Sequence, residues 1–109
     1  MTKKLIRDKI PEIIKNKQNS KKKHIGYTKA TNDKTFYDYL KQKLLEEVNE
    51  FIKADNFDNM IEELADINEV LDTIYKFNNI DIKTVKNIQT QKFKEKGGFE
   101  KRIIWEFEE

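Results

Sequence analysis

Two pairs of acidic residues in the middle of the chain have types and spacing suited to binding a cation. Glu47 and Glu50 are three residues apart, as are Glu63 and Asp66, and twelve residues separate the pairs. Residues three apart in a helix lie on the same face, so each pair would present two carboxylates together. Four close carboxylates repel strongly, and one or two Mg²⁺ ions, which prefer carboxylate and water oxygens, would relieve that repulsion. Acids at this spacing also arise by chance among 20 acidic residues, so their helical positions must decide.

The apolar residues around these acids predict two antiparallel helices. From Phe36 to about Ala54 apolar residues recur at helical spacing, and a second helix follows after a short polar turn. On helical wheels, Glu47 falls inside the apolar arc of the first helix and Glu63 lies among apolar residues of the second. An ionised acid that faces an apolar layer is costly unless it is paired or bound to a metal. Two such acids on facing helices therefore favour a shared cation.

The same wheels separate the remaining charged neighbours. Asp66 borders the apolar sector of the second helix, while Glu50 and Lys43 sit together at the edge of the first. Three other acids point toward solvent on these wheels: Glu46, Glu62 and Glu69. Helical position, more than the number of acids, thus selects the candidate ligands.

The rest of the chain predicts elements that flank this helical hairpin. A short helix is expected over residues 10–14, and a third long helix from Asp81 to the glycine pair at 97–98, where glycine permits the turn that ends it. Residues 102–107 alternate like a strand, which would need residues 25–28 or another subunit as its partner. The expected fold is mainly α, a single domain over residues 1–109, with a short β-segment at the C-terminus and completion by oligomerisation.

Composition limits both the core and the class of protein. With 37% hydrophobic and 39% charged residues, the apolar core must be thin, so we expect a homodimer or homotetramer. The absence of cysteine excludes disulfides and thiolate metal sites, which leaves hard cations held by oxygen ligands. Only Leu5 and Ile6 separate Lys4 from Arg7, too few for a signal-peptide core or a membrane span. We expect a cytoplasmic protein with no membrane partner.

Three segments occur in a characteristic order along the chain. It opens with Lys4-Leu-Ile-Arg-Asp-Lys-Ile-Pro-Glu-Ile-Ile14, continues with Glu47-Val-Asn-Glu50 and Glu63-Leu-Ala-Asp66, and closes with Lys96-Gly-Gly-Phe99. Together these segments resemble the MazG-like superfamily of all-α nucleotide pyrophosphatases, in its small phosphoribosyl-ATP pyrophosphohydrolase-like branch. The resemblance implies a Mg²⁺-dependent enzyme, with Mn²⁺ as a substitute. Its substrate would be a nucleoside triphosphate or related nucleotide, hydrolysed between the α and β phosphorus atoms.

The resemblance also suggests a role for each candidate residue. The four acids would hold the metal, and either Glu47 or Glu50 would orient a water as general base, a choice that stays open. Arg7 and Lys9 are the better candidates for phosphate contacts because they lie in the opening motif. Lys43, at the edge of the first helix, is a further phosphate-binding candidate. Three basic residues near the C-terminus could also contact phosphate, although surface charge explains them equally well: Lys92, Lys96 and Arg102.

A second function competes with the enzyme. Lysines cluster between Lys15 and Lys23, and a basic run of this kind can bind nucleic acid, although a solvated loop is the more frequent explanation. The alternative is therefore a non-catalytic regulator that binds a nucleotide or nucleic acid through this basic flank. Nucleic-acid binding is the less favoured of the two functions.

Overall fold

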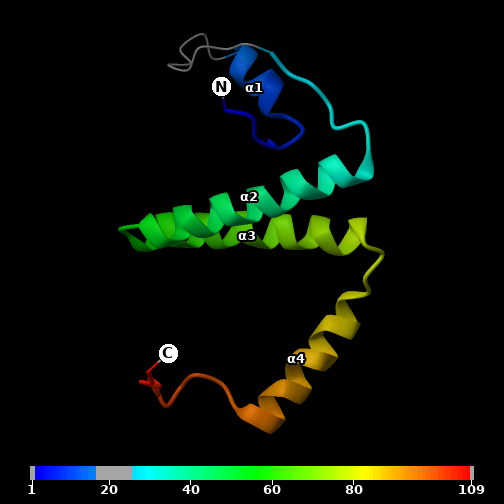
Figure 1. Ribbon diagram of the computed structural model, residues 1–109. Helices are drawn as coiled ribbons and strands as arrows, with labels where there is room; N and C mark the ends of the chain where they lie inside the picture. Colours follow the sequence, from blue (N-terminus) through cyan, green and yellow to red (C-terminus); the bar gives the residue numbers. More distant parts are fainter. Residues whose placement is uncertain (1, 17–25, 109) are drawn as a thin grey trace. The chain divides into compact units, whose positions relative to one another are not determined.

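Figure 1 shows the computed structural model of the protein, which describes residues 2–16 and 26–108. These residues form four helices and no strand: α1 (Ile10–Asn16), α2 (Asp33–Lys53), α3 (Phe57–Phe77) and α4 (Ile82–Lys96). The predicted mainly α class is confirmed. The chain divides into two compact units, Met1–Ile74 and Tyr75–Glu109, so the single-domain organisation stays a prediction. None of the described helices combines the length and apolar character that crossing a bilayer requires.

The first unit is built on the antiparallel hairpin of α2 and α3 (Figure 1). Helix α2 begins earlier than the predicted Phe36, because extended Asn32 caps it and its side chain accepts a hydrogen bond from the Thr35 N–H at 2.8 Å. In the same way, the Asn56 side chain accepts from the Asn59 N–H at 2.8 Å at the start of α3. Polar side chains therefore set where both helices begin, and the short turn between them makes them neighbours.

The core of the hairpin is as thin as the composition suggests. Among the described hydrophobic residues, only Leu40 and Val70 are buried, with 1% and 7% of their surfaces exposed. Other large apolar side chains on the same two helices are exposed, including Leu45, Ile52 and Phe57. Exposed large apolar side chains, where they gather into a patch, are typical of association surfaces.

The N-terminal segment and α1 complete the first unit. Helix α1 starts where the Ile10 N–H bonds the Arg7 carbonyl at 3.0 Å and the Ile13 N–H bonds the Lys9 carbonyl at 3.1 Å. Pro11 lies in the first turn, where its missing N–H leaves no helical bond unmade. Lys15 is the only lysine of the predicted basic flank among the described residues. The other four lie outside them: Lys17, Lys21, Lys22 and Lys23.

In the second unit, α4 has the ends that the sequence predicts. The Asp81 side chain caps it by accepting from the Lys83 N–H at 3.0 Å. Gly97 ends it with φ of +78°, a conformation that glycine adopts without steric cost.

The predicted β-segment at the C-terminus is not found. Described residues 102–108 form no strand, and neither do residues 26–28, the described part of its expected partner; Ile25 lies outside the described residues. Alternating side chains alone do not make a strand, because its backbone N–H and C=O groups need a paired edge.

Two leucines on α2 provide a test of where the fold's stability resides. We expect Leu40→Ala to lower the free energy of unfolding by about 2–5 kcal/mol, because Leu40 is the most buried hydrophobic residue described and its truncation leaves a cavity. Leu45→Ala is the matched control: within one chain this side chain is 61% exposed, so at protein concentrations that keep the chain monomeric its loss should change stability by less than about 0.5 kcal/mol. Urea unfolding measures both. Equal losses would show that burial within one chain does not determine stability.

Candidate metal centre

The hairpin brings three of the four predicted acids together. Glu47 projects from α2, and Glu63 and Asp66 project from α3; one carboxylate oxygen of each lies within 4.8 Å of the others. Glu47 is buried, with 8% of its surface exposed, as its place in the apolar arc of α2 predicts. Glu63 and Asp66 are half-buried. The three-residue spacing and the antiparallel turn thus produce a compact group of oxygen donors.

Glu50, the fourth predicted ligand, lies beside this group and not within it. It is one helical turn beyond Glu47 on α2 and is exposed. Its negative charge nevertheless helps to raise the pKa of Glu63, so it lies close enough to act on the cluster. Its predicted role as a ligand or base stays a prediction.

The repulsion within the cluster is most evident at Glu63, whose pKa is raised. Partial removal from water raises the pKa of this carboxyl, and a hydrogen bond with Glu47 raises it further, as do the charges of Glu47, Asp66 and Glu50. The hydrogen bond between two carboxyl groups requires a proton on one of them. A cation placed among these oxygens would replace that proton and compensate the repulsion.

Two predicted phosphate ligands pair with the cluster. The Lys43 Nζ lies 3.3 Å from Glu47 Oε1, and an Arg7 terminal guanidinium nitrogen lies 2.7 Å from Asp66 Oδ1. Both are charge-assisted contacts between a cationic side chain and a carboxylate. Exposed Lys9 stays a predicted phosphate contact, as do the three basic residues of the second unit: Lys92, Lys96 and Arg102.

Glu46 differs from its prediction. The helical wheel places it toward solvent, but it is half-buried and its two oxygens bind Lys4 Nζ at 3.0 Å and Lys43 Nζ at 3.3 Å. Burial would raise the pKa of Glu46, yet the hydrogen bond from Lys4 and the charge of Lys43 outweigh it and hold the pKa below 4.5. The wheel was wrong here because the N-terminal segment covers this face of α2. By contrast, Glu62 and Glu69 are exposed as predicted.

Comparison with known proteins identifies the family of this chain. The family model for phosphoribosyl-ATP pyrophosphohydrolase matches residues 7–92, a span that contains Arg7, both hairpin helices and the whole acidic cluster. The chain belongs to the phosphoribosyl-ATP pyrophosphohydrolase family. This confirms the resemblance stated from the motifs. No similar curated protein and no similar solved structure was found.

The donor set of this family member fits a divalent hard cation. The three converging side chains offer only carboxylate oxygens, the ligands that Mg²⁺ and Mn²⁺ prefer, and the sequence contains no cysteine that would favour a softer metal. Glu50, exposed and one helical turn along α2 from Glu47, stays the predicted fourth carboxylate.

The repulsion at Glu63 predicts that Glu63→Gln stabilises the metal-free protein at neutral pH. The amide can donate to Glu47 as the protonated acid does, but it adds no charge. Because the pKa of Glu63 is raised above 4.5 in the folded state, the folded protein keeps this proton over a pH range in which the unfolded chain has lost it. Wild-type stability therefore falls as pH rises through that range, and the advantage of the variant grows.

Melting temperatures in a chelator across this pH range measure the effect. Glu62→Gln, one residue away and exposed, is the control and should show no such pH-dependent gain. A Glu63→Gln variant that melts below wild type at neutral pH would mean that Glu63 supports the fold by its charge.

Proposed function

We propose that this protein is a Mg²⁺-dependent nucleotide pyrophosphohydrolase. It cleaves the α–β phosphate bond of a nucleoside triphosphate or related nucleotide and releases a monophosphate and pyrophosphate. One observation carries the proposal: Glu47, Glu63 and Asp66 converge within 4.8 Å in a chain of the phosphoribosyl-ATP pyrophosphohydrolase family. The family supports pyrophosphohydrolysis, and the convergence of carboxylates supports a divalent cation as cofactor.

In this proposal, some acids of the hairpin bind the cation and one acts as the general base. Glu47, Glu63 and Asp66 would hold Mg²⁺, or Mn²⁺ in its place, with Glu50 as a fourth ligand or as the base. Bound there, the cation would supply neutralisation of phosphate charge and a lower pKa for a bound water. We assign the general base to Glu50, because its carboxylate is exposed and lies outside the converging group, whereas Glu47 is buried and paired with Lys43.

Arg7 and Lys43 are suited to bind phosphate once a cation occupies the cluster. Each now neutralises one of the acids that the cation would take over, Asp66 and Glu47. With a cation bound to those oxygens, Arg7 and Lys43 would no longer be needed to neutralise the acids, and both could bind the substrate's phosphate oxygens. Four more basic side chains are proposed as further phosphate contacts: Lys9, Lys92, Lys96 and Arg102.

The working protein is proposed to be a homodimer or homotetramer in the cytoplasm. Support for self-association comes from the exposed apolar side chains of the hairpin and of the second unit, among them Ile88, Phe93 and Trp105.

Removing a proposed ligand should abolish activity and spare the fold. We expect Asp66→Asn and Glu47→Gln to lower Mg²⁺-dependent pyrophosphate release by at least about 100-fold, since loss of even an outer-shell partner of a metal costs about 10- to 100-fold. Both variants should also lose the rise in melting temperature that Mg²⁺ gives wild type. The control is Glu69→Gln, an exposed acid on the same helix α3, which should keep both properties.

The assay screens standard and modified nucleotides with Mg²⁺ or Mn²⁺ and measures released pyrophosphate. A wild-type protein that binds nucleotides but releases no pyrophosphate from any of them would contradict the enzyme and favour a binding regulator. Steep weakening of that binding with added salt would then indicate contacts to nucleic-acid phosphates through the basic flank.

A further inference from the structure

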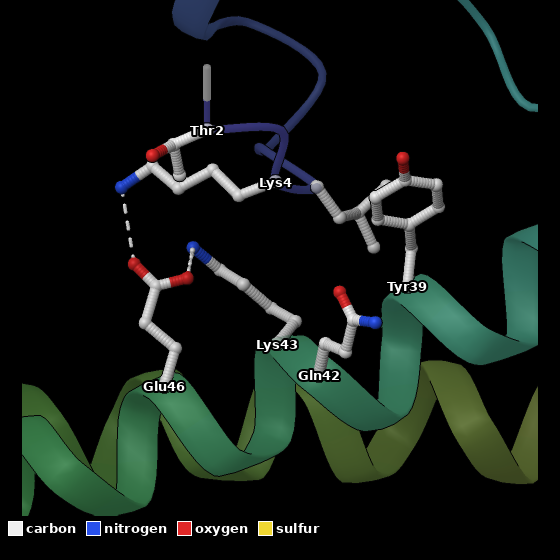
Figure 2. Close-up of a pocket in the computed structure, with 7 residues that line it drawn as sticks. Thr2, Lys4, Tyr39, Gln42, Lys43 and Glu46 are labelled. Atoms are coloured by element: carbon white, nitrogen blue, oxygen red, sulfur yellow. Dashed lines mark hydrogen bonds and ion pairs between the residues drawn. The ribbon is translucent and has the colours of Figure 1, made fainter.

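A hollow of about 530 Å³ lies beside the acidic cluster, between the N-terminal segment and α2 (Figure 2). Helix α2 lines it with four side chains at positions i, i+3, i+4 and i+7, which share one face: Tyr39, Gln42, Lys43 and Glu46. Lys4 and Leu5 line the opposite side. The volume falls within the range of small-molecule sites, about 300–1,000 Å³.

Lys43 joins this hollow to the acidic cluster. Its Nζ lies 3.3 Å from Glu46 Oε2, which faces the hollow, and 3.3 Å from Glu47 Oε1, which belongs to the cluster. The two carboxylate oxygens are therefore separated by no more than twice that distance. One nucleotide can span this gap, with its phosphates at the cluster and its nucleoside in the hollow.

The charges that line the hollow are already balanced. Glu46 binds both Lys4 and Lys43, as Figure 2 shows, and Lys43 is shared with Glu47. A phosphate group placed in the hollow would have to compete with Glu46 for both lysines, so the hollow is a poor phosphate site.

The remaining walls match the chemistry of a heterocyclic base and its sugar. The Tyr39 ring and the Leu5 side chain supply apolar surface, and Tyr39 and Gln42 both project from α2 toward the N-terminal segment (Figure 2). An aromatic ring can stack on any of the nucleotide bases, because each base has a flat π face. The Gln42 amide offers one acceptor and two donors for a base edge.

We infer that this hollow is the nucleoside subsite of the enzyme, with Tyr39 as the stacking residue and Gln42 as the residue that selects the base edge. The inference rests on the proposed function, since it places the nucleoside next to phosphates held at the metal centre. Lys43 marks the boundary between the two parts of the substrate.

Binding of nucleoside monophosphates tests this subsite separately from the phosphates. Calorimetry in Mg²⁺ compares adenosine, guanosine, cytidine, uridine and thymidine monophosphates with inorganic pyrophosphate. We expect Tyr39→Leu to weaken the best-bound monophosphate by about tenfold or more, as loss of base stacking does, and Tyr39→Phe to retain it. Gln42→Ala should flatten the preference among the five bases. Neither change should alter pyrophosphate affinity.

Matched controls lie on the same helix. Tyr37→Leu removes a ring that lies under Lys41 Nζ and not along the hollow, and Asn49→Ala truncates an exposed polar side chain. Both should bind monophosphates as wild type does. Because Gln42 is exposed, Gln42→Ala tests the subsite even if Tyr39→Leu fails to fold.

The outcomes separate this inference from the proposed function. The subsite is overturned if wild type binds none of the monophosphates, or if folded Tyr39→Leu and Gln42→Ala bind them with wild-type affinity and base preference; pyrophosphate release can persist in either case. If wild type releases no pyrophosphate but the variants change monophosphate binding as expected, the subsite stands and the proposed reaction fails.

Discussion

The mutual repulsion of Glu47, Glu63 and Asp66 is the constraint on which the rest of the structure depends. Three carboxylates within 4.8 Å can persist only if the backbone around them is held and their charge is compensated. The hairpin meets the first condition, because capped helices α2 and α3 fix the acids on facing surfaces. A proton, a cationic side chain or a metal ion can meet the second. The proposed cation would therefore meet the second condition at a group of acids that the helices already hold together.

The N-terminal segment supplies part of that compensation. Arg7 reaches Asp66 and Lys4 reaches Glu46, so two residues three apart in the opening motif tie this segment to both hairpin helices. Pairs as exposed as these contribute at most about 1 kcal/mol each to stability. Such weak ties suit the proposal that this segment releases Asp66 when a metal binds, and the same segment forms one wall of the hollow.

Sequence periodicity predicted what depends on a helix's own faces. The apolar repeat of α2 predicted the burial of Glu47. The ends of α4 were predicted from Asp81 and Gly97. The ion pair of Glu46 with Lys4 was not predicted, because no periodic signal links residues 42 positions apart in the chain. The hollow was missed for the same reason: one of its walls is the N-terminal segment before α1, and helical periodicity does not predict where a non-helical segment lies. The C-terminal alternation likewise indicated a strand without showing that an edge exists to pair with it.

The distribution of burial couples the acidic cluster to the stability of the helices that carry it. Leu40 and Val70 form nearly all of the buried apolar core in the described chain, and Glu47 is buried on the same pair of helices. A core this thin offers little to offset three uncompensated charges, so a proton or cation bound at the cluster would contribute directly to the stability of the hairpin. Exposed apolar side chains such as Leu45 and Ile52 then gain importance, because covering them would stabilise the helices without altering the oxygen cluster. Self-association would therefore help to offset the repulsion among the three carboxylates, which the thin core of a single chain offsets only in small part.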